Sequence, residues 1–253
     1  RLPVVEKPEL AEKTAAIGTL EPLLPGSKRV LEAERLQVGY EKTLLEITLH
    51  IRKGQKIAIL GNNGTGKTTF LKTVAGLLPP RGGKYHLGNN IMLGYFDQHS
   101  AEIASEKSVL EHFHDLFPAL TEKEARGILG AYLFGGKEAA KKVDSLSGGE
   151  KAKVLLLKLM LSKANFLLLD EPTNGLDPMG IKEIRLLLKE RLKSPQHCIL
   201  VSSHNLTEIA AVTDILIFIR GGKIIKIVKN GYNEKELEAL YEDIMTSGQR
   251  GEA

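Results

Sequence analysis

One stretch of the chain has the residue types and the spacing of a phosphate-binding loop. Residues 61–68 read Gly-Asn-Asn-Gly-Thr-Gly-Lys-Thr and match the pattern G-x-x-x-x-G-K-S/T. Glycines let backbone N–H groups turn inward around phosphate oxygens, and the start of a following helix adds a partial positive charge. Lys67 would then reach the β and γ phosphates of a nucleoside triphosphate, and the Thr68 hydroxyl would bind Mg²⁺. The residues predicted to contact the nucleotide are Gly61, Asn62, Asn63, Gly64, Thr65, Gly66, Lys67, Thr68 and Thr69.

Two carboxylates follow a second apolar run. Residues 166–169 are Phe-Leu-Leu-Leu, and Asp170 and Glu171 come directly after them. In an open parallel sheet, ligands bind where the strands end. Asp170 is suited to hold Mg²⁺, directly or through water, and Glu171 to orient and deprotonate the water that attacks the γ-phosphate. An adjacent Asp-Glu pair alone is an ordinary surface feature, so the phosphate-binding loop is what favours the catalytic interpretation.

A third motif offers a second anion site. Residues 146–150 read Leu-Ser-Gly-Gly-Glu, in which Ser147, Gly148 and Gly149 open a helix and present free N–H groups and a hydroxyl. Without its neighbours the segment would be a plain helix cap with a glycine turn. A single active site does not need two such anion-binding segments. We therefore predict that Ser147 to Glu150 bind the γ-phosphate of a nucleotide held by another copy, in a head-to-tail pair with ATP between the faces.

The patterning around these motifs predicts how they are positioned. Residues 45–52 alternate strictly, which is typical of a half-buried antiparallel strand, and the apolar residues 56–60 run straight into Gly61 as a buried strand. A helix is predicted over 67–77. Strands over 84–87 and 91–96 are separated by Gly-Asn-Asn, which predicts a hairpin turn.

The second half of the chain alternates helix and strand. Thr121 and Glu124 have the spacing of a capping box, a long helix follows Ser147, and Gly-Gly at 221–222 predicts a hairpin. Strands are predicted near 198–202 and 214–220. A final helix over 233–245 has Asn233 as N-cap and an apolar face of Leu237, Leu240, Tyr241 and Ile244. The whole pattern predicts an α/β fold with a parallel core sheet, an antiparallel β element and a small helical insert.

Composition excludes several classes of protein. The 253 residues carry 35 Lys and Arg against 31 Asp and Glu, a net charge of +4 that identifies no partner. The single cysteine, Cys198, excludes an intrachain disulfide and a cysteine-based zinc site and favours a reducing, cytoplasmic location. No apolar run approaches the roughly 18 residues that a membrane span needs. The chain begins Arg-Leu-Pro without an initiator Met, so we expect a segment of a longer protein.

We expect three regions along the chain. Residues 1–28, which contain four prolines, are predicted to be a linker or extended arm. Residues 29–231 would form the nucleotide-binding domain, with a helical insert at about 103–146. Residues 232–253 would form a C-terminal helix and tail.

In this order and spacing the motifs resemble the ATPase domain of the ATP-binding cassette (ABC) family, a P-loop NTPase. Walker A is then 61–68, Walker B ends at Asp170, and the signature is 146–150. The resemblance implies that Tyr40 stacks on adenine and that Gln98 contacts Mg²⁺ and the attacking water. It further implies that Asp177 crosses the dimer interface and that His204 contacts the γ-phosphate. Glu171, His204, Gln98 and Lys67 would be catalytic, and Thr68, Gln98 and Asp170 would hold the metal.

Two parts of the chain resemble different branches of this family. Residues 31–174 are most similar to the second ATPase domain of F-subfamily proteins, which act on ribosomes or confer antibiotic protection, whereas 175–225 are more similar to drug-export and bacitracin-type transporter ATPases. The resemblance implies an ATPase paired with a second ABC domain, from a copy of itself or in cis. It leaves open a ribosome-linked protein, a subunit of a membrane transporter, and an ATP-binding module that does not hydrolyse.

Overall fold

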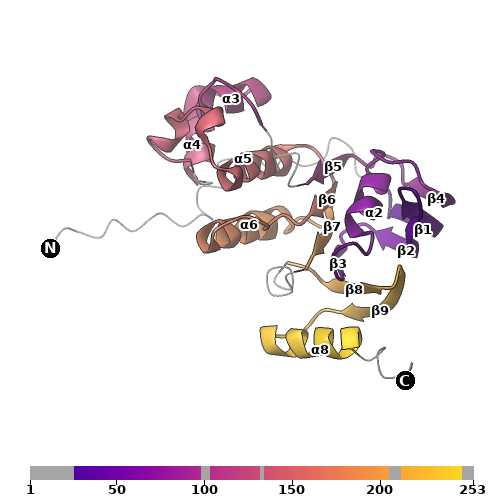
Figure 1. Cartoon of the computed structure of the whole chain (residues 1–253). Helices are drawn as coiled ribbons and strands as arrows, with labels where there is room; N and C mark the ends of the chain where they lie inside the picture. Colours follow the sequence, from indigo (N-terminus) through magenta and orange to yellow (C-terminus); the bar gives the residue numbers. More distant parts are fainter. Residues whose placement is uncertain (1–25, 98–102, 132–133, 205–211, 247–253) are drawn as a thin grey trace.

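A computed structural model of the chain describes residues 26–97, 103–131, 134–204 and 212–246 (Figure 1). Its framework is two β-sheets, with helices packed around the larger one. The predicted α/β fold, with a parallel core sheet, an antiparallel sheet and a small helical subdomain, is confirmed. Within the described ranges, no helix combines the length and the apolar character needed to cross a bilayer.

The larger sheet brings the predicted motifs to one edge. Its strand order is β5-β6-β7-β3-β8-β9, with parallel pairing from β5 to β8 and antiparallel pairing of β8 with β9. The strands are β3 (Lys56–Leu60), β5 (Leu93–Phe96), β6 (Phe166–Asp170), β7 (Cys198–Ser203), β8 (Ile215–Arg220) and β9 (Lys223–Lys229). Because β6, β7 and β3 are parallel neighbours, the residues that follow them share one edge of the sheet.

The smaller sheet is antiparallel, with the order β2-β1-β4. Its strands are β1 (Arg29–Gly39), β2 (Thr43–Arg52) and β4 (Gly82–Leu87). The alternation that predicted β2 is confirmed, because Leu45, Ile47, Leu49 and Ile51 are buried while the residues between them are less so.

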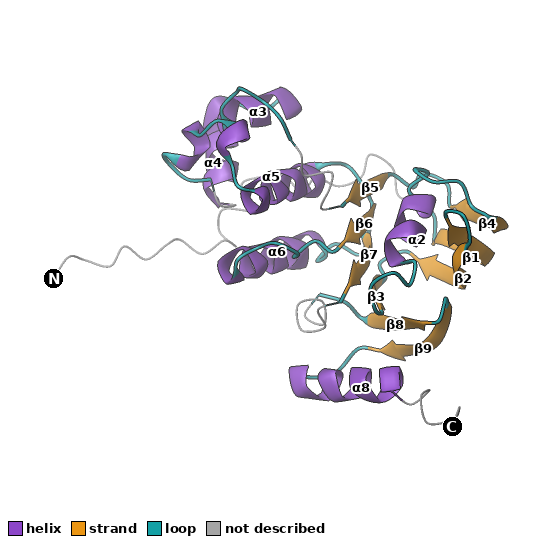
Figure 2. Cartoon of the chain, in the orientation of Figure 1, coloured by secondary structure: helices purple, strands orange, loops and turns teal. Residues whose placement is uncertain are grey.

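Helices contribute the remaining elements, which Figure 2 separates from strands by colour. They are α2 (Lys67–Val74), α3 (Val109–Leu116), α4 (Glu122–Ala131), α5 (Gly148–Leu161), α6 (Pro178–Arg191) and α8 (Glu234–Thr246). Two short 3-10 turns, Glu138–Ala140 and Val143–Ser145, complete the insert around α3 and α4. The predicted capping box at the start of α4 is confirmed: Glu124 N–H donates to Thr121 Oγ1 at 3.3 Å, and Thr121 N–H donates to Glu124 Oε2 at 2.8 Å.

The larger sheet lies between two hydrophobic clusters. Ala58 and Leu60 of β3 pack on one face with apolar residues of α3 to α6 and α8. Ile57 and Ile59, on the opposite face, pack with α2 and the smaller sheet. Burial on both faces explains why the central strands are continuously apolar rather than alternating.

Two predictions about local structure are corrected. The hairpin expected between 84–87 and 91–96 is wrong, because β4 pairs with β1 in the smaller sheet and β5 pairs in parallel with β6 in the larger one. The turn signal is real, since Asn90 has a φ of +59°, but the segment carries the chain from one sheet to the other. The helix expected over 67–77 ends at Val74, and Gly76 then adopts a left-handed φ of +77°.

The remaining local predictions for the second half hold where the structure describes them. β8 and β9 form the predicted hairpin, and Asn233 caps α8 by accepting from Glu236 N–H at 3.0 Å. Cys198 is buried at the start of β7. Most of the predicted linker, residues 1–25, lies outside the described residues, as do residues 205–211 between β7 and β8, where the alternation of helix and strand predicts a helix.

Candidate nucleotide-binding site

The phosphate-binding loop joins β3 to α2 and is built on glycine geometry. Gly64 and Gly66 have φ values of +78° and +94°, which residues with a side chain rarely adopt. A Cβ on Gly61 would meet Ile219 O at 2.6 Å, so only glycine lets the loop lie this close to β8. The turn is closed by Thr65, whose hydroxyl donates to Asn62 O at 2.8 Å.

Lys67 begins α2 and lies under this loop. Its side chain is buried, and Nζ donates to Gly61 O at 2.7 Å and to Asn62 O at 3.1 Å. Burial lowers the pKa of the Lys67 ammonium, while the charges of Glu171 and Asp170 act in the opposite direction. The loop, the ammonium and both predicted carboxylates therefore share one electrostatic environment.

Asp170, at the end of β6, is held by hydroxyl groups from two other elements. Thr68 Oγ1 of α2 donates to Asp170 Oδ1 at 3.0 Å, and the Ser202 hydroxyl of β7 donates to the same oxygen. The register explains the second contact, because Asp170 lies opposite Ser202 in the parallel pair. Ser202 was missed by sequence reasoning, although two serines directly after the apolar run of β7 were an available signal.

The oxygens of Thr68 and Asp170 form the hard donor set that Mg²⁺ prefers. Both residues come from separate elements and are brought together by the fold, as the prediction requires. Gln98, the third predicted metal-binding residue, lies outside the described residues. The donor chemistry of the two described residues fits the predicted ion.

Glu171 has an unusual backbone and a fixed side chain. Its φ is +47°, a left-handed value that costs a non-glycine residue about 1–3 kcal/mol. Glu171 N–H donates to Ser202 O at 3.1 Å, which holds the backbone in place. Its Oε2 lies 2.8 Å from His204 Nδ1 and accepts from His204 N–H at 3.4 Å. Strain of this kind gathers at functional sites, where the surroundings maintain it.

The predicted catalytic residues Lys67, Glu171 and His204 are thus brought together at the edge formed by β3, β6 and β7. The His204 side chain is 52% exposed and that of Glu171 is 17% exposed, so the pair lies at the surface of the site. A carboxylate oriented in this way can accept a proton from water.

A buried carboxylate beside the site was not predicted. Asp97, just after β5, is 6% exposed, and its Oδ2 accepts from Tyr95 Oη at 3.1 Å and lies 3.5 Å from Lys72 Nζ of α2. Burial, followed by the charge of Asp97, raises the pKa of Tyr95, so its hydroxyl remains a donor. The ion pair between Lys72 and Asp97 therefore joins α2, the helix that begins at the phosphate-binding loop, to the residue before Gln98.

Tyr40 follows β1 and is 58% exposed. Its backbone oxygen accepts from the guanidinium of Arg81, which fixes the turn that carries it. An exposed ring on a fixed turn is available for stacking.

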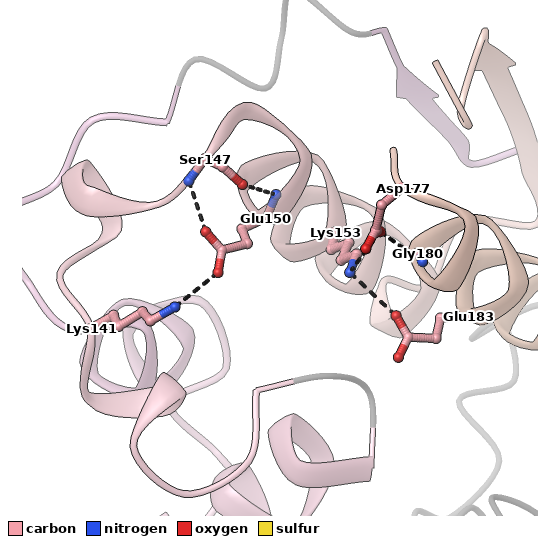
Figure 3. Close-up of polar contacts among 7 residues, drawn as sticks. All are labelled: Lys141, Ser147, Glu150, Lys153, Asp177, Gly180 and Glu183. Atoms are coloured by element: carbon pink, nitrogen blue, oxygen red, sulfur yellow. Dashed lines mark hydrogen bonds and ion pairs between the residues drawn. The ribbon is translucent and has the colours of Figure 1, made fainter. Parts of the chain in front are cut away.

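The third motif opens α5 as a capping box (Figure 3). Glu150 N–H donates to Ser147 Oγ at 3.2 Å, and Ser147 N–H donates to Glu150 Oε2 at 2.8 Å. The other carboxylate oxygen accepts from Lys141 Nζ of the helical insert at 3.1 Å. The hydrogen bond from Ser147 N–H, more than that from Lys141, lowers the pKa of Glu150. The insert therefore contacts this motif directly.

Asp177 lies next to Lys153 of α5, close to the third motif (Figure 3). Its Oδ1 accepts from Gly180 N–H at 2.9 Å and lies 4.0 Å from Lys153 Nζ, which also pairs with Glu183 at 3.2 Å. An open groove of about 1070 Å³ runs along 146–153 and 174–177. None of residues 61–69 is among its described lining, so this groove borders the third motif and not the phosphate-binding loop of the same chain.

Comparisons with known proteins identify the family of the chain. The ABC transporter family model matches residues 44–174. The chain is 43% identical over 187 residues to the ATP-binding protein YdiF of Bacillus subtilis, covering 73% of this chain and 29% of that protein. It is 35% identical over 237 residues to the ATP-binding protein Uup of Escherichia coli, covering 89% of this chain and 36% of that protein. The chain therefore spans about a third of the length of these relatives.

A solved structure supports the fold. The dimeric post-hydrolysis structure of the ATP-binding cassette MJ0796 bound to ADP and Pi aligns with a TM-score of 0.67 at 20% identity, covering 80% of this chain and 100% of that one. Identity at this level shows the fold alone. The family model, in contrast, covers more than half of the chain and includes the phosphate-binding loop, the third motif and both carboxylates. The chain belongs to the ABC family, as an ATPase domain with the P-loop NTPase fold.

Proposed function

We propose that this domain binds MgATP at residues 61–69 and hydrolyses it at the edge formed by β3, β6 and β7. The observation that carries the proposal is the convergence there of five side chains from α2 and from the ends of β6 and β7: Lys67, Thr68, Asp170, Glu171 and His204. The buried ammonium of Lys67 offsets the charge of the β and γ phosphates, and glycine-permitted backbone N–H groups surround them. The ring of Tyr40 stacks on adenine.

In the proposed reaction, water attacks the γ-phosphorus, its proton passes to Glu171, and ADP leaves with the electrons of the broken P–O bond. His204 orients Glu171 through Nδ1 and contacts the γ-phosphate through Nε2. Thr68 and Asp170, with Gln98, would hold Mg²⁺, which would supply positive charge that offsets the charge of the triphosphate.

Titration with MgATP tests the binding step, and release of inorganic phosphate tests turnover. Lys67→Ala should abolish ATP binding and turnover, because it removes the cation beneath the loop. Lys84→Ala is the matched control, since Lys84 pairs with Glu34 on the smaller sheet and is 77% exposed. Equal loss in both variants, or none in either, would contradict the assignment of the loop.

We further propose that the third motif completes the site of a second ABC domain. The motif Ser147 to Glu150 would bind the γ-phosphate held by the opposite domain through the Ser147 hydroxyl and the N–H groups of Gly148 and Gly149, while the Glu150 carboxylate holds the helix cap. Asp177 would cross the interface. The groove along these residues, separate from 61–69, supports this arrangement. Light scattering of Glu171→Gln with and without MgATP tests it: a doubled mass means two copies pair, and a monomer that binds ATP means the motif pairs with a different domain.

For the biological role, we propose a cytoplasmic F-subfamily-like protein that acts on the ribosome. Support comes from the similarity to Uup over 89% of the chain. ATP-dependent co-sedimentation of Glu171→Gln with ribosomes tests the role. A subunit of a drug or bacitracin transporter is the second candidate, favoured by residues 175–184 and 202–204, and recovery of a membrane protein with the chain in place of ribosomes would support it.

A further inference from the structure

The last helix of the domain touches the phosphate-binding loop. Tyr241 of α8 donates its hydroxyl to Asn62 Oδ1 at 3.2 Å, joining residues 179 positions apart. The Tyr241 ring packs on Phe218 of β8, with ring centroids 6.3 Å apart. The hydroxyl therefore reaches the loop from a partly buried ring that packs against the core.

Helix α8 is fixed at both ends. Asn233 caps its first turn, and the Arg220 guanidinium donates to Ile244 O at 2.9 Å and Met245 O at 3.0 Å in its last turn. Leu237 is fully buried between these ends. Arg220 directly follows Ile219, whose carbonyl oxygen lies where a Cβ on Gly61 would be, so the end of β8 lies beside both the helix and the loop.

Asn62 is where these restraints meet. Its carbonyl accepts from Lys67 Nζ and from the Thr65 hydroxyl, while its side chain accepts from Tyr241. A Cβ on neighbouring Gly64 would meet nothing within 4 Å, so the outer part of the loop has little steric support of its own. The hydrogen bond from Tyr241 restrains this part of the loop from outside.

We propose that Tyr241 is a positioning residue for ATP binding, whose hydroxyl holds Asn62 so that the phosphate-binding loop is ordered before the triphosphate arrives. A loop ordered in advance loses less conformational entropy on binding its ligand. Burial raises the pKa of Tyr241, so the hydroxyl stays protonated and able to donate at neutral pH. The inference rests on the proposed function, because it requires a nucleotide at residues 61–69.

Calorimetric titration with MgATP, in a Glu171→Gln background that suppresses hydrolysis, tests the proposal. Tyr241→Phe keeps the ring on Phe218 and removes only the hydroxyl. We expect it to raise the Kd for MgATP by about three-fold to ten-fold, the range that one neutral hydrogen bond is worth. Tyr232→Phe is the matched control, since it removes a hydroxyl just before α8, and should leave the Kd unchanged.

A double-variant cycle separates positioning from a general structural effect. Asn62→Ala should raise the Kd about as much as Tyr241→Phe, and the double variant no further. With Glu171 intact, Tyr241→Phe should raise KM and leave kcat unchanged. A lowered melting temperature with an unchanged Kd, or effects of the two variants that multiply, would overturn the proposal. If the parent protein binds no MgATP, the proposed function itself fails. If the parent binds MgATP and Tyr241→Phe leaves the Kd unchanged, only the inference about Tyr241 is refuted.

Discussion

Replacing Gly66 with Ala should damage the domain more than the same change at Gly64, two positions away in the same loop. Both glycines have left-handed backbones, with φ of +94° and +78°. This backbone costs an alanine about 1–2 kcal/mol. At Gly66 the new Cβ would also lie 2.9 Å from Leu45 Cβ and 3.2 Å from Leu44 Cβ, whereas at Gly64 it would meet nothing within 4 Å.

The contact at Gly66 cannot relax freely, because Leu45 is fully buried in the smaller sheet. Overpacking of this kind costs about 1–3 kcal/mol. The free energy of unfolding should therefore fall by about 1–2 kcal/mol in Gly64→Ala and by about 2–5 kcal/mol in Gly66→Ala.

Urea unfolding of both variants without nucleotide measures this difference, with equal m-values showing that the denatured state is unchanged. MgATP titration of the folded variants should show weaker binding for Gly66→Ala, because Gly66 is the N-cap of α2. Equal destabilisation of the two variants, within about 0.5 kcal/mol, would refute the reasoning from side-chain contact.

Three further predictions follow from single contacts. Thr68→Ala should raise the Mg²⁺ concentration that gives half-maximal turnover by about ten-fold or more, because the Thr68 hydroxyl donates to Asp170. Thr68→Ser should restore the parent value, and an unchanged Mg²⁺ titration in Thr68→Ala would contradict the prediction. Lys141→Met should lower the free energy of unfolding in urea by less than about 1 kcal/mol, because the pair with Glu150 is partly solvated, and a loss well beyond that would show a stronger coupling. Burial raises the pKa of Cys198 from 9.0 to about 11, so at pH 8 a disulfide reagent should label the native thiol about a hundred-fold more slowly than the unfolded one. Equal labelling rates in the two states would show that Cys198 is accessible. Because the pKa is higher in the folded state, the contribution of the neutral thiol to the free energy of unfolding is complete below pH 9 and is lost as the pH rises through 11.

The phosphate-binding loop was predictable because its chemistry is local. The glycines, Lys67 and Thr68 lie within eight residues, and an apolar strand and a helix flank them. The capping box at Thr121 was predictable for the same reason, since its hydrogen bonds span three residues.

Contacts between elements that are far apart in the sequence were not predictable in the same way. Ser202 reaches Asp170 only because β6 and β7 are parallel neighbours in a register that pairs them. Tyr241 and Asn62 meet only because α8 packs over β8. Neither contact follows from the spacing of residues in the sequence, because each depends on the tertiary fold.

The false hairpin has a similar cause. Residues that tolerate a left-handed backbone serve a hairpin and a crossing between sheets equally well, as Asn90 does here. The partner strands decide between the two, and β4 and β5 find theirs in different sheets.

Glu171→Gln tests whether Glu171 acts as the base in ATP hydrolysis. Phosphate release from MgATP and the Kd for MgATP should be measured on the same preparations of parent and variant. Phosphate release should fall by about 10²-fold to 10⁴-fold, while MgATP should still bind, because Lys67, Thr68 and the loop are intact. A variant that binds MgATP and releases phosphate at the parent rate would contradict this role of Glu171.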